Sequence, residues 1–430
     1  MIDVKLVRET PDVLRQALEK RGEKAAIVDD ILSLDQQRRK LLQVVEGQRA
    51  EQRRLSKEIG KLQQQEQKAP QLESEMQGMI AKMRLLSDEV ASDERELTAL
   101  EEKLRPLLLE VPNIPDPAVL AGHSSEDNIV VRAWGRPQEF PFTPRPHWEL
   151  GEKLGIIDFE RGVKLSGTRF YVLKGLGARL ERSLISFMID LHVREHGYTE
   201  VYTPFMVKKE CLFASGNLPK FGDNLYHDAE EDFWWVPTAE VPLTNLHRDE
   251  ILEPGTLPLH YVAYTPCFRR EKAAAGKETR GLKRGHQFDK VEMYIFAEPE
   301  YSNQELENMI AAAEDICRKL ELSYRVVQLC TGDLGFASAK TYDLEVWAPG
   351  CAEWLEVSSC SNCTDFQARR ANIRYRPGPG AKPNLVHTLN GSGLALPRIV
   401  IALLENRQRE DGTISVPCAL QPYLGTDVIA

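Results

Sequence analysis

Two runs of apolar residues at heptad spacing constrain the first quarter of the chain more tightly than any other feature. In residues 31–62 seven of the ten a and d positions are apolar, and in residues 72–107 ten of eleven are. Pro70 interrupts the pattern between them, because proline cannot continue a helix. We therefore predict an antiparallel coiled-coil hairpin with helices at about residues 30–67 and 71–107, each about 55 Å long at about 1.5 Å per residue. Such an arm is too thin to hold a core of its own.

The arm belongs to an N-terminal domain that we place at residues 1–110. In its first part, a small cap of about 29 residues, Thr10 followed by Pro11 predicts the start of a helix. Three prolines within residues 111–117 end the second long helix, so residues 111–118 are interpreted as a linker. Residues 119–430 are long enough for a large core. We expect helices there at 177–197, 303–322 and 399–406, and a strand from residue 197 that Pro204 closes.

The two long helices carry opposite charge. Residues 31–68 hold nine Lys or Arg and five Asp or Glu, residues 71–105 hold five and nine, and the net charges are therefore +4 and −4. The whole chain has a net charge of −10, so any RNA contact needs a local basic surface. Six outward-facing basic residues of the first helix could make phosphate contacts: Arg39, Lys40, Arg53, Arg54, Lys57 and Lys61. The alternative is a solvated, salt-bridged surface, which is common on coiled coils.

We do not expect a membrane-spanning or secreted protein. No apolar run reaches the length of a membrane span, and the charged start MIDVKLVRETPDVL lacks the apolar core of a signal peptide. Eight cysteines lie scattered without the short spacings of a disulfide framework. We expect a cytoplasmic protein with reduced thiols and no membrane contact.

Residues 261–299 have the pattern of a long β-hairpin whose two runs are joined by a basic, glycine-containing loop. Phe288 and Glu292 are an even number of residues apart, so they face the same side of a strand, roughly 13 Å from each other. Arg269, at the root of the hairpin, can bind phosphate, while the ring can stack on a base and the carboxylate can accept an ammonium group. The hairpin suits a nucleotide joined to an amine-bearing substrate, but an ordinary hairpin with a solvated loop fits the same features. Because the sequence has no glycine-rich P-loop, a bound ATP must be held by side chains and a metal ion.

Several motifs, in a fixed order, resemble those of one enzyme family. FRRE, the basic loop and HQFDKVEM resemble motif 2 of the class II aminoacyl-tRNA synthetases, at residues 261–297. VPTAE at 236–240, EVSSCSNCTDFQARR at 356–370 and NGSGLALPR at 390–398 are similar to the seryl-tRNA synthetases in particular. The resemblance implies an α+β fold, an antiparallel β-sheet flanked by helices and preceded by the coiled-coil arm. It also implies motif 1 at residues 180–207, motif 3 at residues 390–406, and a homodimer built through motif 1.

The resemblance implies the ATP-binding residues. Arg269 would contact the α-phosphate, Arg398 the γ-phosphate and Phe288 the adenine. Arg269, Arg398 and Glu271 form the expected catalytic set, while Glu356 and Ser359 would hold Mg²⁺ with ATP. The full ATP-binding set is Arg269, Arg270, Glu271, Phe288, Glu356, Val357, Ser358, Ser359 and Arg398. In a regular strand Glu356 and Ser359 face opposite sides, so either the backbone is irregular there or one of these two assignments is wrong.

The resemblance likewise implies a serine-binding set: Thr238, Ala239, Glu240, Arg269, Arg284, Glu292, Asn390 and Ser392. Carboxylates can accept the ammonium and hydroxyl groups of serine, and such a site rejects alanine by about four orders of magnitude. Threonine must be excluded by size, which is a weaker filter, so it is the competitor to test. Two carboxylates could instead be a general acid and base, but adenylation needs no enzymic base because the attacking carboxylate is already ionised.

Cys360 and Cys363 form a CxxC pair that could belong to a zinc site. The sequence offers no second pair to complete four ligands, so Cys351 and His387 would have to be recruited. The common members of the family match these cysteines as ordinary sequence, and we expect no zinc.

Together these inferences predict serine–tRNA ligation in two steps. L-serine attacks ATP to give seryl-adenylate and pyrophosphate, and the 3′-terminal ribose hydroxyl of tRNA(Ser) then takes the seryl group. By family analogy we also expect tRNA(Sec) as an acceptor. Two alternatives stay open: a paralogue that loads serine onto a carrier protein, against which the basic arm argues, and a non-catalytic coiled-coil RNA-binding protein, against which the retained pocket residues argue.

Overall fold

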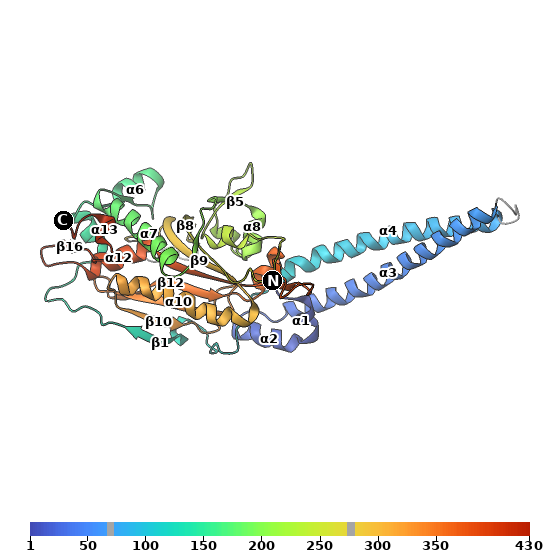
Figure 1. Cartoon of the computed structure of the whole chain (residues 1–430), viewed down its shortest axis with the longest axis horizontal. Coiled ribbons are helices and arrows are strands. Elements are labelled where there is room, and N and C mark those ends of the chain that lie inside the picture. Colours follow the sequence, from blue (N-terminus) through green and yellow to red (C-terminus); the bar gives the residue numbers. More distant parts are fainter. Residues whose placement is uncertain (67–72, 273–279) are drawn as a thin grey trace. The chain divides into compact units, whose positions relative to one another are not determined.

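The computed structural model describes residues 1–66, 73–272 and 280–430, which form two compact units (Figure 1). The smaller unit comprises Ile2–Glu19 and Glu23–Val111, and the larger comprises Pro112–Ala430 with Met1 and Lys20–Gly22. Within the described ranges, no helix is both long and apolar enough to span a membrane.

In its described residues, the smaller unit contains four helices, α1 (Val4–Glu9), α2 (Pro11–Lys20), α3 (Ile27–Glu66) and α4 (Glu73–Glu110). The start of α2 at Pro11 agrees with the prediction. α3 begins three residues earlier than predicted and α4 ends three residues later, although Pro106 lies inside it. A proline near the end of a long helix removes a single backbone hydrogen bond, and the flanking Leu104, Leu108 and Leu109 are buried.

Helices α3 and α4 pack against each other in opposite directions. Gln48 donates a hydrogen bond to Asp93 at 2.8 Å, and Gln52, further along α3, donates to Ser87, which comes earlier in α4. Each predicted a or d residue within the described parts of the two helices is buried or half-buried. Leu72 lies outside the described residues. The antiparallel coiled-coil prediction is therefore confirmed.

The larger unit is built on an eight-stranded sheet with the order β1-β10-β11-β12-β15-β9-β8-β4. In that order its strands are Ile129–Trp134, Tyr324–Gln328, Lys340–Ala348, Glu353–Asn362, His387–Ala395, Gln287–Ala297, Leu259–Phe268 and Thr199–Glu200. All neighbouring strands are antiparallel except β4 and β8. The predicted fold class is confirmed.

Three helices contribute most to the core around this sheet: α7 (Leu176–Arg194), α10 (Ser302–Lys319) and α12 (Leu396–Asn406). Their inner side chains are fully buried together with those of the sheet, as for Leu184, Ile310 and Ile401. α7 and α10 each end three residues before the predicted position, and α12 starts three residues before it. Hydrophobic periodicity locates a helix but does not show where its terminal hydrogen bonds stop.

The strand predicted from residue 197 is wrong in its extent. β4 covers only Thr199–Glu200 at the edge of the sheet, and the chain forms a separate strand, β5 (Met206–Lys208), after Pro204. β5 pairs with β6 (Phe233–Trp235) in a two-stranded sheet.

The remaining elements are short. They are η2 (Ser125–Asp127), α5 (His147–Lys153), β2 (Ile157–Asp158), α6 (Phe159–Ser166), β3 (Val172–Leu173), α8 (Lys209–Ser215), η3 (Gly222–Asn224), α9 (Glu240–Thr244), β7 (Ile251–Leu252), η5 (Pro299–Tyr301), α11 (Phe366–Ala371), β13 (Arg374–Tyr375), β14 (Asn384–Leu385), β16 (Ile414–Ser415), α13 (Gln421–Leu424) and β17 (Val428–Ile429).

Candidate active site

A cavity of about 370 Å³ lies where β9, β12 and β15 meet the start of α12. Twelve residues singled out in the sequence line it: Thr238, Glu240, Arg269, Glu271, Arg284, Phe288, Glu292, Glu356, Ser359, Asn390, Ser392 and Arg398. Six lining residues were not predicted: Leu282, Lys283, Gly285, Lys290, Ala395 and Pro397. The fold therefore brings together side chains that come from four separate stretches of sequence.

The hairpin provides one wall of the cavity. β8 and β9 pair antiparallel from Leu259 opposite Phe296 to Phe268 opposite Gln287, which confirms the predicted hairpin. Because side chains alternate along a strand, Phe288, Lys290 and Glu292 share one face of β9, and all three line the cavity.

A β-bulge in β12 resolves the conflict over Glu356 and Ser359. Leu344 of β11 lies opposite Ser358, but its neighbour Glu345 lies opposite Glu356, so Val357 is an extra residue in the ladder. One extra residue reverses the alternation beyond it. Glu356 and Ser359 consequently both line the cavity.

Arg398 lies in the first turn of α12, directly after Pro397, as the sequence indicated. Its Nη1 donates a hydrogen bond to the carbonyl oxygen of Glu356 at 2.6 Å and lies 3.2 Å from the Glu356 carboxylate. The guanidinium is therefore held at the cavity wall by β12, where it can meet an anionic group.

Oxygen atoms suited to a hard divalent cation lie on Glu356, Ser359 and Asp343. Asp343 of β11 lies opposite Ser359 and hydrogen-bonds with it, and its Oδ1 is buried without a hydrogen-bond partner among the described residues. Burial and the charge of Glu356 raise the pKa of Asp343 well above its ordinary value. A carboxylate pair whose charges repel is the kind of donor set that Mg²⁺ accepts. No local sequence signal indicated Asp343, because its pairing with Ser359 depends on strand register.

Lys290 is a further residue that the sequence analysis missed, although the alternation rule that selected Phe288 and Glu292 also covers it. Its Nζ lies 2.5 Å from Glu292 and donates a hydrogen bond to Thr238 at 2.8 Å. Glu292 is 1 % exposed. Burial, reinforced by the charge of Glu292, raises the pKa of Glu240 to about 7. This end of the cavity can bind a small ammonium group between two carboxylates.

Another part of the cavity lining is aromatic and cationic. The guanidinium of Arg269 lies 5.1 Å from the ring centre of Phe288, and its Nε donates a hydrogen bond to the carbonyl of Pro237 at 3.2 Å. Arg284 donates a hydrogen bond to Glu271 at 3.4 Å across the root of the hairpin. A flat base and a phosphate both find partners here.

Four predicted residues do not line the cavity with their side chains. Ala239 and Val357 are fully buried in apolar cores. Arg270 lies over the ring of Tyr226, 5.0 Å from its centre, and Ser358 donates a hydrogen bond to the carbonyl of Ser392. The side chains of these four residues point away from the cavity, so they could contact a ligand directly only through their main-chain atoms.

The six basic residues predicted for RNA contact, Arg39, Lys40, Arg53, Arg54, Lys57 and Lys61, are all exposed on α3. Arg54 also pairs with Glu51 at 2.8 Å. Exposure fits both an RNA-binding stripe and a solvated surface.

The cysteines of the CxxC pair are both buried. His387, one of the two residues that a zinc site would have to recruit, hydrogen-bonds with Ser302, and Cys351, the other, hydrogen-bonds with Glu405.

Comparison with known proteins places this geometry in a family. Residues 223–407 match the model of the tRNA synthetase class II core domain (G, H, P, S and T), and residues 1–115 match the seryl-tRNA synthetase N-terminal domain. The chain is 59% identical over 425 residues to a serine–tRNA ligase of Thermomicrobium roseum, covering 99% of this chain and 94% of the relative. It is 57% identical to that of Dehalococcoides mccartyi over the full length of both chains.

Solved structures agree with these matches. Seryl-tRNA synthetase from Pyrococcus horikoshii, complexed with ATP, superimposes with a TM-score of 0.92 at 40% identity, covering 100% of this chain and 99% of that one. The cytoplasmic enzyme of Naegleria fowleri, in complex with AMP, has a TM-score of 0.86 at 30% identity, covering 100% and 98%. The fold and the cavity thus define a class II aminoacyl-tRNA synthetase. Within that class, the chain belongs to the seryl-tRNA synthetase family.

Proposed function

We infer that this chain attaches L-serine to tRNA in a reaction that converts ATP to AMP and pyrophosphate. The observation that carries the inference is a single cavity lined by arginines, a phenylalanine, a threonine and two carboxylates, of which Glu292 is fully buried and Glu240 half-buried. Such a cavity can hold a nucleotide and a small hydroxylated amine in contact with each other.

In the first step we propose that the serine carboxylate attacks the α-phosphorus of ATP, and that pyrophosphate leaves with the electrons of the broken P–O bond. Arg269 neutralises the charge that develops on the α-phosphate, and Arg398 binds the γ-phosphate. Phe288 stacks on the adenine. Glu271, paired with Arg284, holds the root of the hairpin beside the nucleotide.

Glu356 and Ser359, with Asp343 behind them, would hold Mg²⁺ at the phosphates. When bound, the ion supplies positive charge to the triphosphate. The β-bulge supports this assignment because it turns both Glu356 and Ser359 toward the cavity.

Serine would be recognised by Thr238, Glu240 and Glu292, with Asn390 and Ser392 closing the pocket. In the second step the 3′-terminal ribose hydroxyl of tRNA attacks the carbonyl of seryl-adenylate, and AMP leaves. Lys290 keeps Glu292 in place in the absence of substrate through its ion pair.

We further propose that the chain works as a homodimer in the cytoplasm, with tRNA(Ser) as acceptor and tRNA(Sec) as a second one. The stretch expected to build the dimer exposes Tyr202 and Met206, at 81 % and 51 %. The exposed basic stripe of α3 supports the tRNA partner.

Purified protein should charge tRNA(Ser) and tRNA(Sec) transcripts with serine. We expect alanine to be used about 10⁴-fold less efficiently, because it leaves buried polar groups unpaired, and threonine to be rejected less strongly. The measurement is kcat/KM for each amino acid in an aminoacylation assay. Adenylate formation without any charging of tRNA would favour a carrier-protein paralogue instead, and the absence of both would favour a non-catalytic protein.

The pH dependence of serine binding provides a separate prediction. The ammonium of serine requires ionised Glu240, so the KM for serine should rise as the pH falls below about 7, by up to about tenfold per pH unit. Folding responds in the opposite sense: the folded protein retains a proton that the unfolded chain loses near pH 4.5, so the contribution of Glu240 to stability falls as the pH rises from 4.5 to about 7.

The measurement is the KM for serine in ATP–pyrophosphate exchange across this range, in the wild type and in Glu240→Gln. The amide cannot ionise, so the variant should show a high KM with no slope. An equal slope in the variant would assign the titration to another group.

A further inference from the structure

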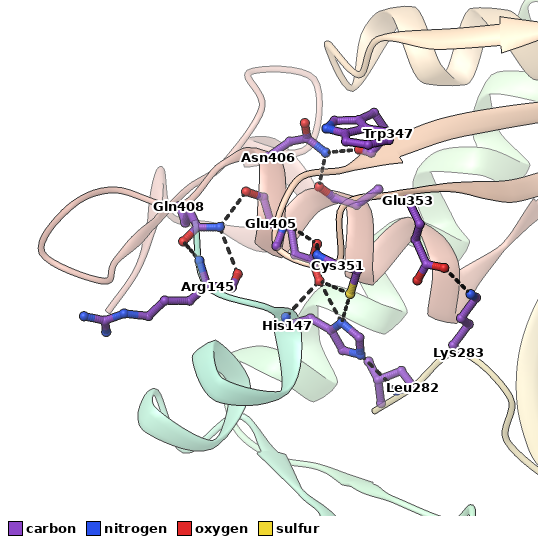
Figure 2. Close-up of polar contacts among 12 residues, drawn as sticks. Arg145, His147, Leu282, Lys283, Trp347, Cys351, Glu353, Glu405, Asn406 and Gln408 are labelled. Carbon is purple, nitrogen blue, oxygen red and sulfur yellow. Dashed lines mark hydrogen bonds and ion pairs between the residues drawn. The ribbon is translucent and has the colours of Figure 1, made fainter. Parts of the chain in front are cut away.

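A second group of polar side chains, two of them buried and one half-buried, lies outside the cavity and has no assigned role (Figure 2). His147 from α5, Glu405 from α12 and Cys351 after β11 meet there. The Nδ1 of His147 lies 2.8 Å from Oε1 of Glu405, and Sγ of Cys351 lies 3.0 Å from the same oxygen. His147 and Glu405 are 1 % and 0 % exposed.

Glu405 is surrounded by donors. Its Oε1 accepts hydrogen bonds from the backbone N–H and the ring of His147, and its Oε2 accepts from the backbone N–H groups of Gly350 and Cys351 at 2.9 and 3.0 Å. Although burial acts in the other direction, the hydrogen bonds from His147 and Cys351 hold the pKa of Glu405 below its ordinary value. The carboxylate is therefore ionised and accepts hydrogen bonds only.

This arrangement determines which ring nitrogen of His147 carries the proton. Because Glu405 only accepts, Nδ1 of His147 must donate to it. The other ring nitrogen, Nε2, accepts a buried hydrogen bond from the backbone N–H of Leu282 at 3.1 Å, so it carries no proton. The imidazole thus connects the last part of α12 to the segment that leads into β9.

The segment from residue 280 to 282 is fitted closely to α5. The guanidinium of Arg280 lies over the ring of Trp148, 5.0 Å from its centre. Gly281 has φ +81°, and a Cβ at this position would lie 2.2 Å from Nε2 of His147, so only glycine allows the approach. Leu282 itself is 1 % exposed.

Directly after this segment come Lys283 and Arg284, which line the cavity. Lys283 is held by Glu353 of β12 at 2.5 Å. The helix that carries Glu405 carries Arg398 two turns earlier. A shift of the segment would therefore move Arg284 relative to Arg398.

We propose that His147 is a positioning residue for adenylate formation. Held by Glu405, His147 anchors Leu282 and so fixes the position of Lys283 and Arg284 relative to Arg398. The proposal rests on the proposed function, because the chemistry that it positions is the reaction of serine with ATP.

A metal centre is the competing interpretation, since the three ligand atoms of His147, Cys351 and Glu405 lie within 4.8 Å of one another. A metal on Nδ1 would move the ring proton to Nε2. Nε2 and the N–H of Leu282 would then both be donors, so the hydrogen bond between them could not form. A metal and the Leu282 hydrogen bond exclude each other.

Two substitutions of His147 separate its two contacts. The amide of His147→Asn reaches the position of Nδ1 and keeps a donor for Glu405, but offers nothing to Leu282. The amide of His147→Gln reaches the position of Nε2 and offers Leu282 an acceptor. In serine-dependent ATP–pyrophosphate exchange, we expect His147→Asn to lower kcat/KM for ATP about ten- to a hundredfold, which is the effect of displacing a cavity-lining residue by about 1 Å. His147→Gln should stay within about threefold of the wild type.

A second readout does not depend on activity. Backbone amide hydrogen exchange, followed by mass spectrometry, should speed up in the peptide that contains Leu282 in His147→Asn and should stay slow in His147→Gln. Cys351→Ser keeps a donor to Glu405 and should leave both readouts unchanged.

Equal losses in the Asn and Gln variants, or full activity in His147→Asn, would overturn the proposal. If Cys351→Ser lost both bound zinc and ATP–pyrophosphate exchange activity, a metal centre would be established instead. If the wild type shows no serine-dependent exchange, the proposed function fails, and the amide exchange at Leu282 still tests the anchoring.

Discussion

Replacing Arg269 by alanine is expected to lower the kcat of serine-dependent ATP–pyrophosphate exchange about a thousandfold, which is the usual loss when one preorganised group is removed from a developing negative charge. The guanidinium lines the cavity and is held in place from two sides, by the ring of Phe288 and by the carbonyl of Pro237. It therefore needs little reorganisation when the five-coordinate phosphorus forms. Lysine should not replace it, because a single ammonium cannot offer the planar pair of donors.

The neighbouring residue provides a matched control. Arg270 has the same side chain, but its guanidinium lies over Tyr226 and outside the cavity. We expect Arg270→Ala to stay within about threefold of the wild type in kcat, since a cation–π contact at such a site contributes only about 0.5–1 kcal/mol. Similar losses in the two variants would mean that the cavity does not distinguish the phosphate-binding arginine from its neighbour.

Removing the arm should separate the two steps of the reaction. When residues 31–107 are replaced by a short Gly-Ser linker, we expect exchange to stay within a few-fold of the wild type, because all cavity-lining residues lie between Thr238 and Arg398. Charging of tRNA should fall at least about a hundredfold, since several phosphate contacts are lost together. The measurements are serine-dependent exchange and aminoacylation on the same preparation.

The structure supports the design of this deletion. Near the base of the arm Arg38 of α3 lies 3.7 Å from Glu101 of α4, so the two helices lie side by side within about two turns of the cut ends, which favours a short linker. A companion variant leaves the arm in place and changes its six exposed basic residues to glutamine, and it should reproduce the charging defect. Charging that persists in both variants would show that the arm does not select the tRNA.

Much of the candidate site could be predicted because its motifs resemble those of a known family, and a few of its residues also follow local rules. Phe288 and Glu292 share a face by the alternation of a strand, and Arg398 follows a proline that suits the first turn of a helix. The same alternation rule also selects Lys290, which was not among the predicted residues. Asp343 and His147 could not be predicted in this way, because each acts through a partner that is distant in sequence. The partner is Ser359 for Asp343 and Leu282 for His147. Nothing in their immediate neighbourhood indicates those pairs.

The amino-acid sequence by itself determined the coiled-coil arm, because heptad spacing is a property of consecutive residues. The α+β class and the identity of most cavity-lining side chains followed from the resemblance of its ordered motifs to those of a known family. Only the tertiary structure decided that Glu356 and Ser359 share a wall, since the bulge at Val357 exists only in the pairing of β12 with β11. It also decided which ring nitrogen of His147 donates, because that choice depends on Glu405 and Leu282 contacting the same ring from distant parts of the chain. Distances between remote segments are set by packing, and a linear pattern does not contain them.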